Sequence, residues 1–210
     1  MEMWFAIVLI FFGPGNCEVL DLSCDQIRNF VDGHNSRRIK IAKGELEGQP
    51  PATNLKFMMW DNELAAKAAR WASNNKFAHN PDHTIGSNRF QTGENLFYIS
   101  TTNKQANLNI NDALDAWFGE HKAFTFGPLD PEDFSSPPQI GHYTQMVWAN
   151  TKYLGCAVSK YGDDWLTYLV VCNYGPGGNY LGSPPYKTAD NGNGALICDD
   201  DCSDPYDGNC

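Results

Sequence analysis

The sequence lacks the motifs of the common enzyme and metal-binding classes. It contains no Cys-x-x-Cys pair, which argues against a zinc ribbon or a thioredoxin-like redox site. It has neither the His-Glu-x-x-His helix of metalloproteases nor the Gly-x-Ser-x-Gly turn of serine hydrolases. Arg-Gly-Asp and the N-glycosylation signal Asn-x-Ser/Thr are absent as well. Because no activated nucleophile is recognisable, we predict that the protein is not an enzyme.

Positive charge is also scarce, and no basic block offsets the acidic residues. The chain has 15 Lys and Arg against 25 Asp and Glu, which gives a net charge of −10 at pH 7. An acidic chain of this kind is a poor ligand for nucleic acid and for anionic membrane surfaces. We therefore predict that nucleic acids are not among its partners.

Long apolar runs are absent except at the N-terminus. Residues 4–12 form an unbroken apolar run that is too short to span a bilayer, and residues 15–17 follow it at the usual spacing for cleavage. The pattern predicts a signal peptide over residues 1–17 and a secreted, extracellular protein without a membrane span. The alternative interpretation is a buried N-terminal strand.

The cysteine count supports secretion. The sequence has seven cysteines, and six remain if cleavage removes Cys17. An even number in an oxidising compartment fits three disulfides. The six are Cys24, Cys156, Cys172, Cys198, Cys202 and Cys210.

The hydrophobic pattern predicts helices in the first half and strands in the second, which is an α+β layout around one core. Helical spacing of apolar residues predicts helices over residues 25–43, 62–77 and 109–122, with Asp61 as N-cap of the second. Strands are predicted over residues 144–148, 155–159 and 165–172, the last two joined by a hairpin at residues 161–164. A short apolar run covers residues 95–99.

Two blocks in the C-terminal half, residues 141–151 and 169–180, carry the strongest family signal. Together with His34-Asn35-Ser36, Gly93-Glu94-Asn95-Leu96 and Trp117-Phe118-Gly119-Glu120, they resemble the CAP superfamily of cysteine-rich secretory, antigen-5 and pathogenesis-related proteins. The resemblance covers residues 24–182 and is closest to the arthropod venom-allergen branch. It implies an α-β-α sandwich over residues 18–182, followed by an acidic, Cys-containing tail over residues 183–210.

The resemblance implies one disulfide, between Cys156 and Cys172. The other four cysteines allow three pairings, which the sequence cannot choose between, and we expect them to pin the N- and C-terminal extensions. Venom allergens usually carry two further cysteines at the positions of Asn75 and Asp82, so this chain is missing a whole disulfide.

The resemblance also implies a central cleft that contains His79, Glu94, Glu120 and His142. Neutral imidazole is a good ligand for zinc, and a neighbouring carboxylate orients the ring and raises its basicity. We therefore expect that His79 and His142 could bind zinc or another divalent metal, although no cofactor is required. The alternative is a buried polar network that braces the cleft.

The function implied by the resemblance is binding without turnover. Some family members hold fatty acids, eicosanoids or sterols, so we expect a venom or salivary protein that binds small hydrophobic mediators in a host. The alternative is a protein-interaction antagonist that inhibits platelets, integrins or ion channels. Gly162 and Asp163 at the hairpin tip resemble the display of adhesive ligands, although turns favour Gly and Asp anyway. We expect a monomer.

Overall fold

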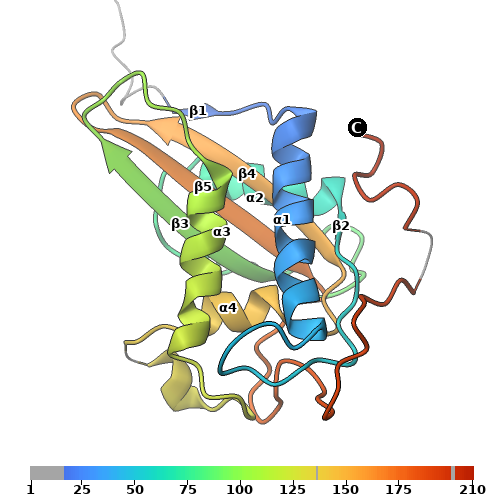
Figure 1. Cartoon of the computed structure of the whole chain (residues 1–210). Coiled ribbons are helices and arrows are strands. Elements are labelled where there is room, and N and C mark those ends of the chain that lie inside the picture. The colour runs from blue at the N-terminus through green and yellow to red at the C-terminus, as the bar shows by residue number, and fades with distance from the viewer. Residues whose placement is uncertain (1–16, 136, 200–201) are drawn as a thin grey trace, which may run out of the picture.

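A central sheet of five strands organises the molecule, as the computed structural model shows (Figure 1). The structure describes residues 17–135, 137–199 and 202–210, so the predicted signal peptide lies almost wholly outside the described residues. The sheet order is β1-β4-β5-β3, with antiparallel pairing throughout, and β2 pairs with β4 in parallel. The strands are β1 (Glu18–Val19), β2 (Met59–Trp60), β3 (Gly93–Thr101), β4 (Tyr153–Tyr161) and β5 (Leu166–Gly175).

Helices cover both faces of this sheet. A large buried cluster joins α1, α3 and α4 to one face, and a smaller cluster joins α2 to the other. The arrangement is therefore the predicted α-β-α sandwich. The helices are α1 (Cys24–Ala42), α2 (Asn62–Ala72), α3 (Ile110–Gly119) and α4 (Gly141–Met146), and a 3-10 turn (Glu120–Lys122) continues α3.

The first three helices form where their sequences predict, because local signals fix them. Ser23 and Gln26 make a reciprocal capping box at the start of α1. Asp61 caps α2 by accepting a hydrogen bond from the Leu64 amide, as predicted, although the helix ends at Ala72 rather than at Phe77. Two-residue strands such as β1 and β2 were not predicted, because they are too short to show a periodicity.

The strand predicted over residues 144–148 is wrong. These residues form the end of α4 and the turn after it. A short apolar run does not distinguish a buried helix from a buried strand. The start of α4 is capped by Glu120, whose carboxylate accepts hydrogen bonds from the amides of His142 and Tyr143. A cap contributed from more than 20 residues away leaves no local signal in the sequence.

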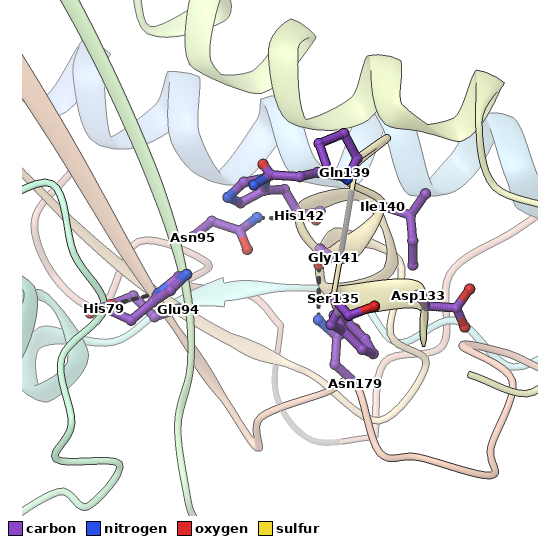
Figure 2. Close-up of a pocket in the computed structure, with 12 residues that line it drawn as sticks. His79, Glu94, Asn95, Asp133, Ser135, Gln139, Ile140, Gly141, His142 and Asn179 are labelled. Atoms are coloured by element: carbon purple, nitrogen blue, oxygen red, sulfur yellow. Dashed lines mark hydrogen bonds and ion pairs between the residues drawn. The ribbon is translucent and has the colours of Figure 1, made fainter. Parts of the chain in front are cut away.

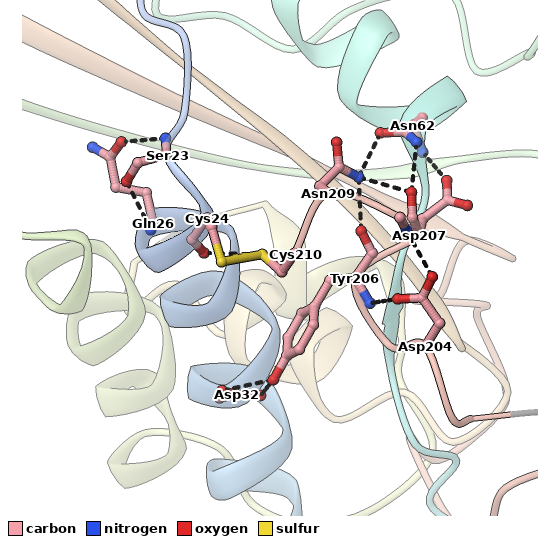
Figure 3. Close-up of a disulfide and its surroundings, with 11 residues drawn as sticks. Ser23, Cys24, Gln26, Asp32, Asn62, Asp204, Tyr206, Asp207, Asn209 and Cys210 are labelled. Carbon is pink, nitrogen blue, oxygen red and sulfur yellow. Dashed lines mark hydrogen bonds between the residues drawn. A yellow bond between two sulfur atoms is a disulfide. The ribbon is translucent and has the colours of Figure 1, made fainter.

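Three disulfides fasten the chain. Cys156 and Cys172 are directly paired residues of β4 and β5. The other two disulfides are Cys24–Cys210, which joins the start of α1 to the C-terminus (Figure 3), and Cys198–Cys202 within the tail.

The C-terminal segment is further held by backbone bonds and by one aromatic side chain. The Trp60 amide donates to the carbonyl of Pro205, and Tyr206 donates its hydroxyl proton to Asp32 while Arg28 lies over its ring.

Among the described residues, Cys17 is exposed and forms no disulfide. No helix in the described part of the chain is long and apolar enough to cross a membrane.

Candidate functional site

The candidate site is a cleft of about 440 Å³ at one end of β3, between α4 and the loops on either side of the sheet edge (Figure 2). Its lining combines two histidines, one buried carboxylate and several amide and apolar side chains. The lining residues are His79, Glu94, Asn95, Asp133, Phe134, Ser135, Pro137, Gln139, Ile140, Gly141, His142 and Asn179.

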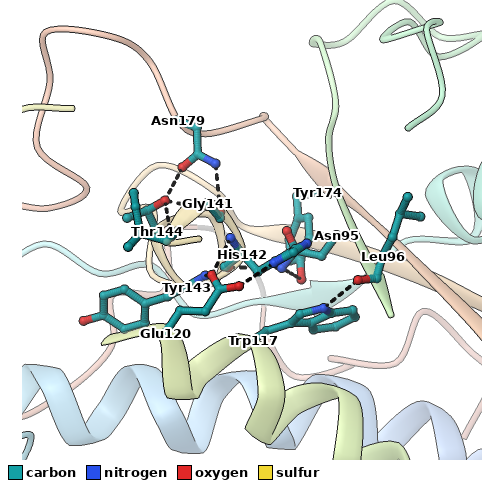
Figure 4. A network of polar contacts seen from close by, with 11 residues as sticks. Asn95, Leu96, Trp117, Glu120, Gly141, His142, Tyr143, Thr144, Tyr174 and Asn179 are labelled. Carbon is teal, nitrogen blue, oxygen red and sulfur yellow. Dashed lines mark hydrogen bonds and ion pairs between the residues drawn. The ribbon is translucent and has the colours of Figure 1, made fainter. Parts of the chain in front are cut away.

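One side of the cleft is the His142–Glu120 pair. The Nδ1 atom of His142 lies 2.6 Å from Glu120 Oε1, while Glu120 Oε2 accepts the His142 and Tyr143 amides at 2.9 and 3.0 Å. The ring of Trp117 stacks on the imidazole at 6.2 Å between centroids. Both partners are mostly buried, with 18% and 15% of their side chains exposed. Figure 4 shows that the histidine is held from its ring, its backbone and its face.

The other side is the His79–Glu94 pair. His79 Nδ1 lies 3.0 Å from Glu94 Oε1, which also accepts the amide of Asn80 at 2.9 Å. Glu94 is 6% exposed, whereas 62% of the His79 side chain is exposed. The second carboxylate oxygen, Glu94 Oε2, is buried and has no hydrogen-bond partner among the described residues. This side of the cleft therefore has a fixed carboxylate and an open imidazole.

A buried polar chain connects the cleft to α1. Asn95, which lies between His142 and the His79–Glu94 pair in Figure 2, donates to the His142 carbonyl at 3.1 Å and to the Tyr174 hydroxyl at 3.0 Å. The Tyr174 hydroxyl in turn lies 2.9 Å from His34 Nε2, and His34 Nδ1 donates to the Phe30 carbonyl. Burial lowers the pKa of His34 to about 3 and raises that of Tyr174 well above its usual value. Both side chains are therefore neutral near pH 7. This series of hydrogen bonds fixes the backbone of His142.

Arg38 holds the far end of α4. It is fully buried, and its guanidinium donates to the carbonyls of five residues. Because Arg38 is desolvated and has no carboxylate partner among the described residues, its pKa falls to about 9. The guanidinium thus ties α1 to the turn that follows α4. The five carbonyls belong to Lys56, Met146, Trp148, Ala149 and Thr151.

The donor atoms suit a metal ion only in part. In both pairs the carboxylate can only accept, so Nδ1 carries the proton and Nε2 keeps its lone pair, which is the arrangement found in metal-ligating histidines. Glu94 Oε2 is in addition a buried acceptor without a partner among the described residues. Among the described residues, however, no group of three or more His, Cys, Asp or Glu side chains is arranged to hold a metal. The cleft offers two imidazoles, those of His79 and His142.

The four residues expected to form the cleft lie in two pairs, and three of them line it. His79, Glu94 and His142 face the cavity, whereas Glu120 bonds to His142 from outside the lining. Asn95 and Asn179 were not predicted as site residues, although Asn95 directly follows Glu94 in the sequence. The serine in the cleft is Ser135, whose hydroxyl donates to the Glu132 carbonyl.

The hairpin tip lies at the other end of the sheet. Gly162 has φ of +97°, and a Cβ there would meet the Trp165 carbonyl at 2.2 Å, so the turn requires glycine. The Asp163 carbonyl accepts a hydrogen bond from Lys104. Since the turn itself explains both residues, the tip carries no separate sign of a ligand.

A second, apolar groove of about 270 Å³ lies between α2, the segment after β1 and the start of α1. Apolar side chains and alanines make up most of its lining, which also includes Asp21, Asn62, Cys156 and Asn209. Its apolar lining consists of Val19, Leu20, Leu22, Ile27, Trp60, Ala65, Ala66, Ala69 and Ala157.

Fold and cleft together define an α-β-α sandwich with paired His and Glu side chains at the edge of its sheet. The model of the cysteine-rich secretory protein (CAP) family matches residues 31–174, so the chain belongs to that family. Venom allergen 5.02 of Dolichovespula maculata is 38% identical over 178 residues, which cover 81% of this chain and 80% of that protein. Scoloptoxin SSD976 of Scolopendra dehaani is 38% identical over 195 residues, which cover 92% of this chain and 87% of that protein.

Solved structures agree with this assignment. The crystal structure of NaASP2 with Zn²⁺ superposes with a TM-score of 0.67 at 31% identity, and the match covers 80% of this chain and 88% of that one. The comparisons confirm the CAP fold and the likeness to venom allergens that the sequence predicted.

Proposed function

We propose that the protein is secreted and binds a small hydrophobic ligand, such as a fatty acid or an eicosanoid, without turning it over. The groove beside α2 carries this proposal, because most of its lining residues are apolar and those from α2 are mainly alanines. Burying an acyl chain there would gain about 0.8 kcal/mol for each methylene group removed from water. The likeness to venom allergens supports action outside the cell.

Native mass spectrometry with oleic acid and arachidonic acid as probes tests this proposal. The unaltered protein should give a one-to-one adduct, and Ala69→Trp should abolish it because the indole fills the groove. Ala116→Trp, at an exposed position on α3, is the matched control and should bind as the unaltered protein does. Absence of an adduct, or equal uptake by both variants, would overturn the groove as the binding site.

We also propose that the cleft binds zinc through His79 Nε2 and His142 Nε2. The two carboxylate-paired Nδ1 atoms support it, since they leave both Nε2 atoms able to accept a metal. A bound ion would supply a positive charge between the pairs, and affinity should be modest because water must complete the shell.

Zinc uptake measured by calorimetry tests the cleft. His79→Ala and His142→Ala should each abolish uptake, whereas His83→Ala, at an exposed position outside the cleft, should leave it unchanged. Equal uptake by the His79/His142 double variant would show that the metal binds elsewhere.

A further inference from the structure

The outer edge of β3 has unpaired backbone groups. Strand β3 is the last strand of the sheet on the side away from β1, and Figure 1 shows no strand beyond it. In an antiparallel ladder, successive residues direct their N–H and C=O groups alternately to the two neighbouring strands. The orientation of each residue can therefore be followed across the sheet from one known bond.

Two independent bonds give the same result. Val158 of β4 accepts the Leu20 amide on the β1 side, so its neighbour Ala157 bonds to β5 through Val171. By alternation, Cys172 and Val170 direct their groups to Asn95 and Phe97 of β3. It follows that Leu96, between these two, faces outward, and the Leu96 carbonyl indeed accepts a hydrogen bond from Trp117 Nε1 at 3.0 Å.

The next two outward-facing residues are Tyr98 and Ser100. Their backbone N–H and C=O groups have no hydrogen-bond partner within the described part of the chain. Both residues are exposed, with 52% of Tyr98 accessible. Four backbone groups at two-residue spacing match the repeat of an extended peptide.

This edge lacks the usual protection against strand pairing. Exposed edges are normally blunted by charged side chains, by proline or by a bulge. Residues 95–103 contain no charged residue and no proline, and the register of β3 with β5 is continuous from Gly93 to Thr101. The stretch Phe97 to Thr101 is also rich in residue types that favour strands.

An aromatic surface lies next to the unpaired groups. Helix α2 ends at Ala72, so it does not cover the far end of the sheet. There the rings of Phe77 and Tyr98 meet edge-on at 4.6 Å between centroids, and 55% of Phe77 is exposed. A strand that paired with Tyr98 and Ser100 would place every second side chain beside these rings.

We propose that the β3 edge at Tyr98 and Ser100 binds an extended segment of another protein by strand addition, with an apolar side chain of that segment against Phe77 and Tyr98. A foreign partner fits better than a second copy, because two chains of net charge −10 repel each other. The surface is separate from both the metal cleft and the apolar groove, so it does not depend on either ligand.

A phage-displayed library of random twelve-residue peptides serves as the probe. Selected peptides should contain alternating apolar or β-branched residues. Ser100→Pro removes the outward amide without breaking a backbone bond to β5, and it should weaken binding by about tenfold or more. It also removes the hydroxyl that lies 2.7 Å from Thr167 Oγ1, a loss that Ser100→Ala shares. Ser100→Ala keeps that amide and should bind within about twofold of the unaltered protein. Urea denaturation, measured in parallel, reports that Ser100→Pro is folded.

Three results would overturn the proposal. They are a library that yields no binder, binders unaffected by Ser100→Pro in a folded protein, and binders lost equally with Ser100→Ala. Sedimentation that showed a dimer abolished by Ser100→Pro would assign the edge to a second copy instead.

Discussion

The two His–Glu pairs of the cleft have the same chemistry but are held very differently. His142 lies on a helix, stacks on Trp117 and is bonded through its ring and its backbone to one carboxylate. His79 lies on a loop, and the ring bond to Glu94 is its one side-chain hydrogen bond among the described residues. The cleft thus combines a fixed imidazole with an adjustable one.

The difference has a structural cause. The His142 side is braced by groups from three parts of the chain, namely Glu120 after α3, Asn95 on β3 and Arg38 on α1. Within the described ranges, Glu94 is the one residue that hydrogen-bonds to the His79 ring. A ligand that bridges both histidines would therefore order His79 rather than move His142.

Arg38→Met should have the largest effect on stability, because it removes the brace of α4 and the guanidinium donor of five carbonyls. Two of these carbonyls, those of Trp148 and Ala149, keep a backbone amide as donor. We expect the free energy of unfolding to fall by about 4 kcal/mol. Urea denaturation measures it, with Arg70→Met at an exposed position of α2 as the control. A loss below about 1 kcal/mol would mean that water replaces the guanidinium at little cost.

Substituting the two carboxylates should have the next largest effect and should distinguish the two His–Glu pairs by the stability that each variant loses. Glu120→Gln places an amide group against three donors and should cost about 2 kcal/mol. Glu94→Gln can keep the acceptor at Oε1 and put its amide where Oε2 has no partner, so the change should stay within about 1 kcal/mol. Equal losses in urea denaturation would show that the two sides are braced alike.

The sequence predicted the three long helices and the β4–β5 hairpin because their signals are local. The spacing of Ile27, Phe30 and Val31 is visible within one helix, and Asp61 caps the helix that it precedes. The four cleft residues came from family resemblance alone. Arg38 was not predicted as a brace, because its carbonyl partners on the α4 side lie 108 to 113 residues away. Helix α4 was mistaken for a strand because its cap, Glu120, also lies far from it in the sequence.

The pH dependence of stability should report on His34, which ends the buried series of hydrogen bonds that begins at the His142 carbonyl. Burial, followed by the nearby Arg37 and Arg38 charges, holds the pKa of folded His34 near 3, against 6.5 when unfolded. Between these values only the unfolded chain binds the proton, so stability is complete above pH 6.5 and falls as the pH drops. The slope is about 1.4 kcal/mol per pH unit for this one group.

His34→Gln keeps a polar side chain but cannot titrate, which isolates that contribution. Between about pH 7.5 and pH 5, the unaltered protein should lose about 2 kcal/mol more than His34→Gln does. Urea denaturation at the two pH values measures the difference. Parallel losses would mean that His34 takes up its proton in the folded state, and that the Tyr174 contact does not depend on a neutral ring.

His79→Ala should have the smallest effect on stability, below about 0.5 kcal/mol, because most of the side chain is exposed and one ring bond is lost. The same substitution should abolish zinc uptake. Together, these two results would show that His79 contributes to ligand binding and little to stability. That is expected of a side chain on the more exposed side of the cleft. A loss of stability as large as that of Glu120→Gln would instead make His79 a brace like its counterpart, and the contrast between the two pairs would not hold.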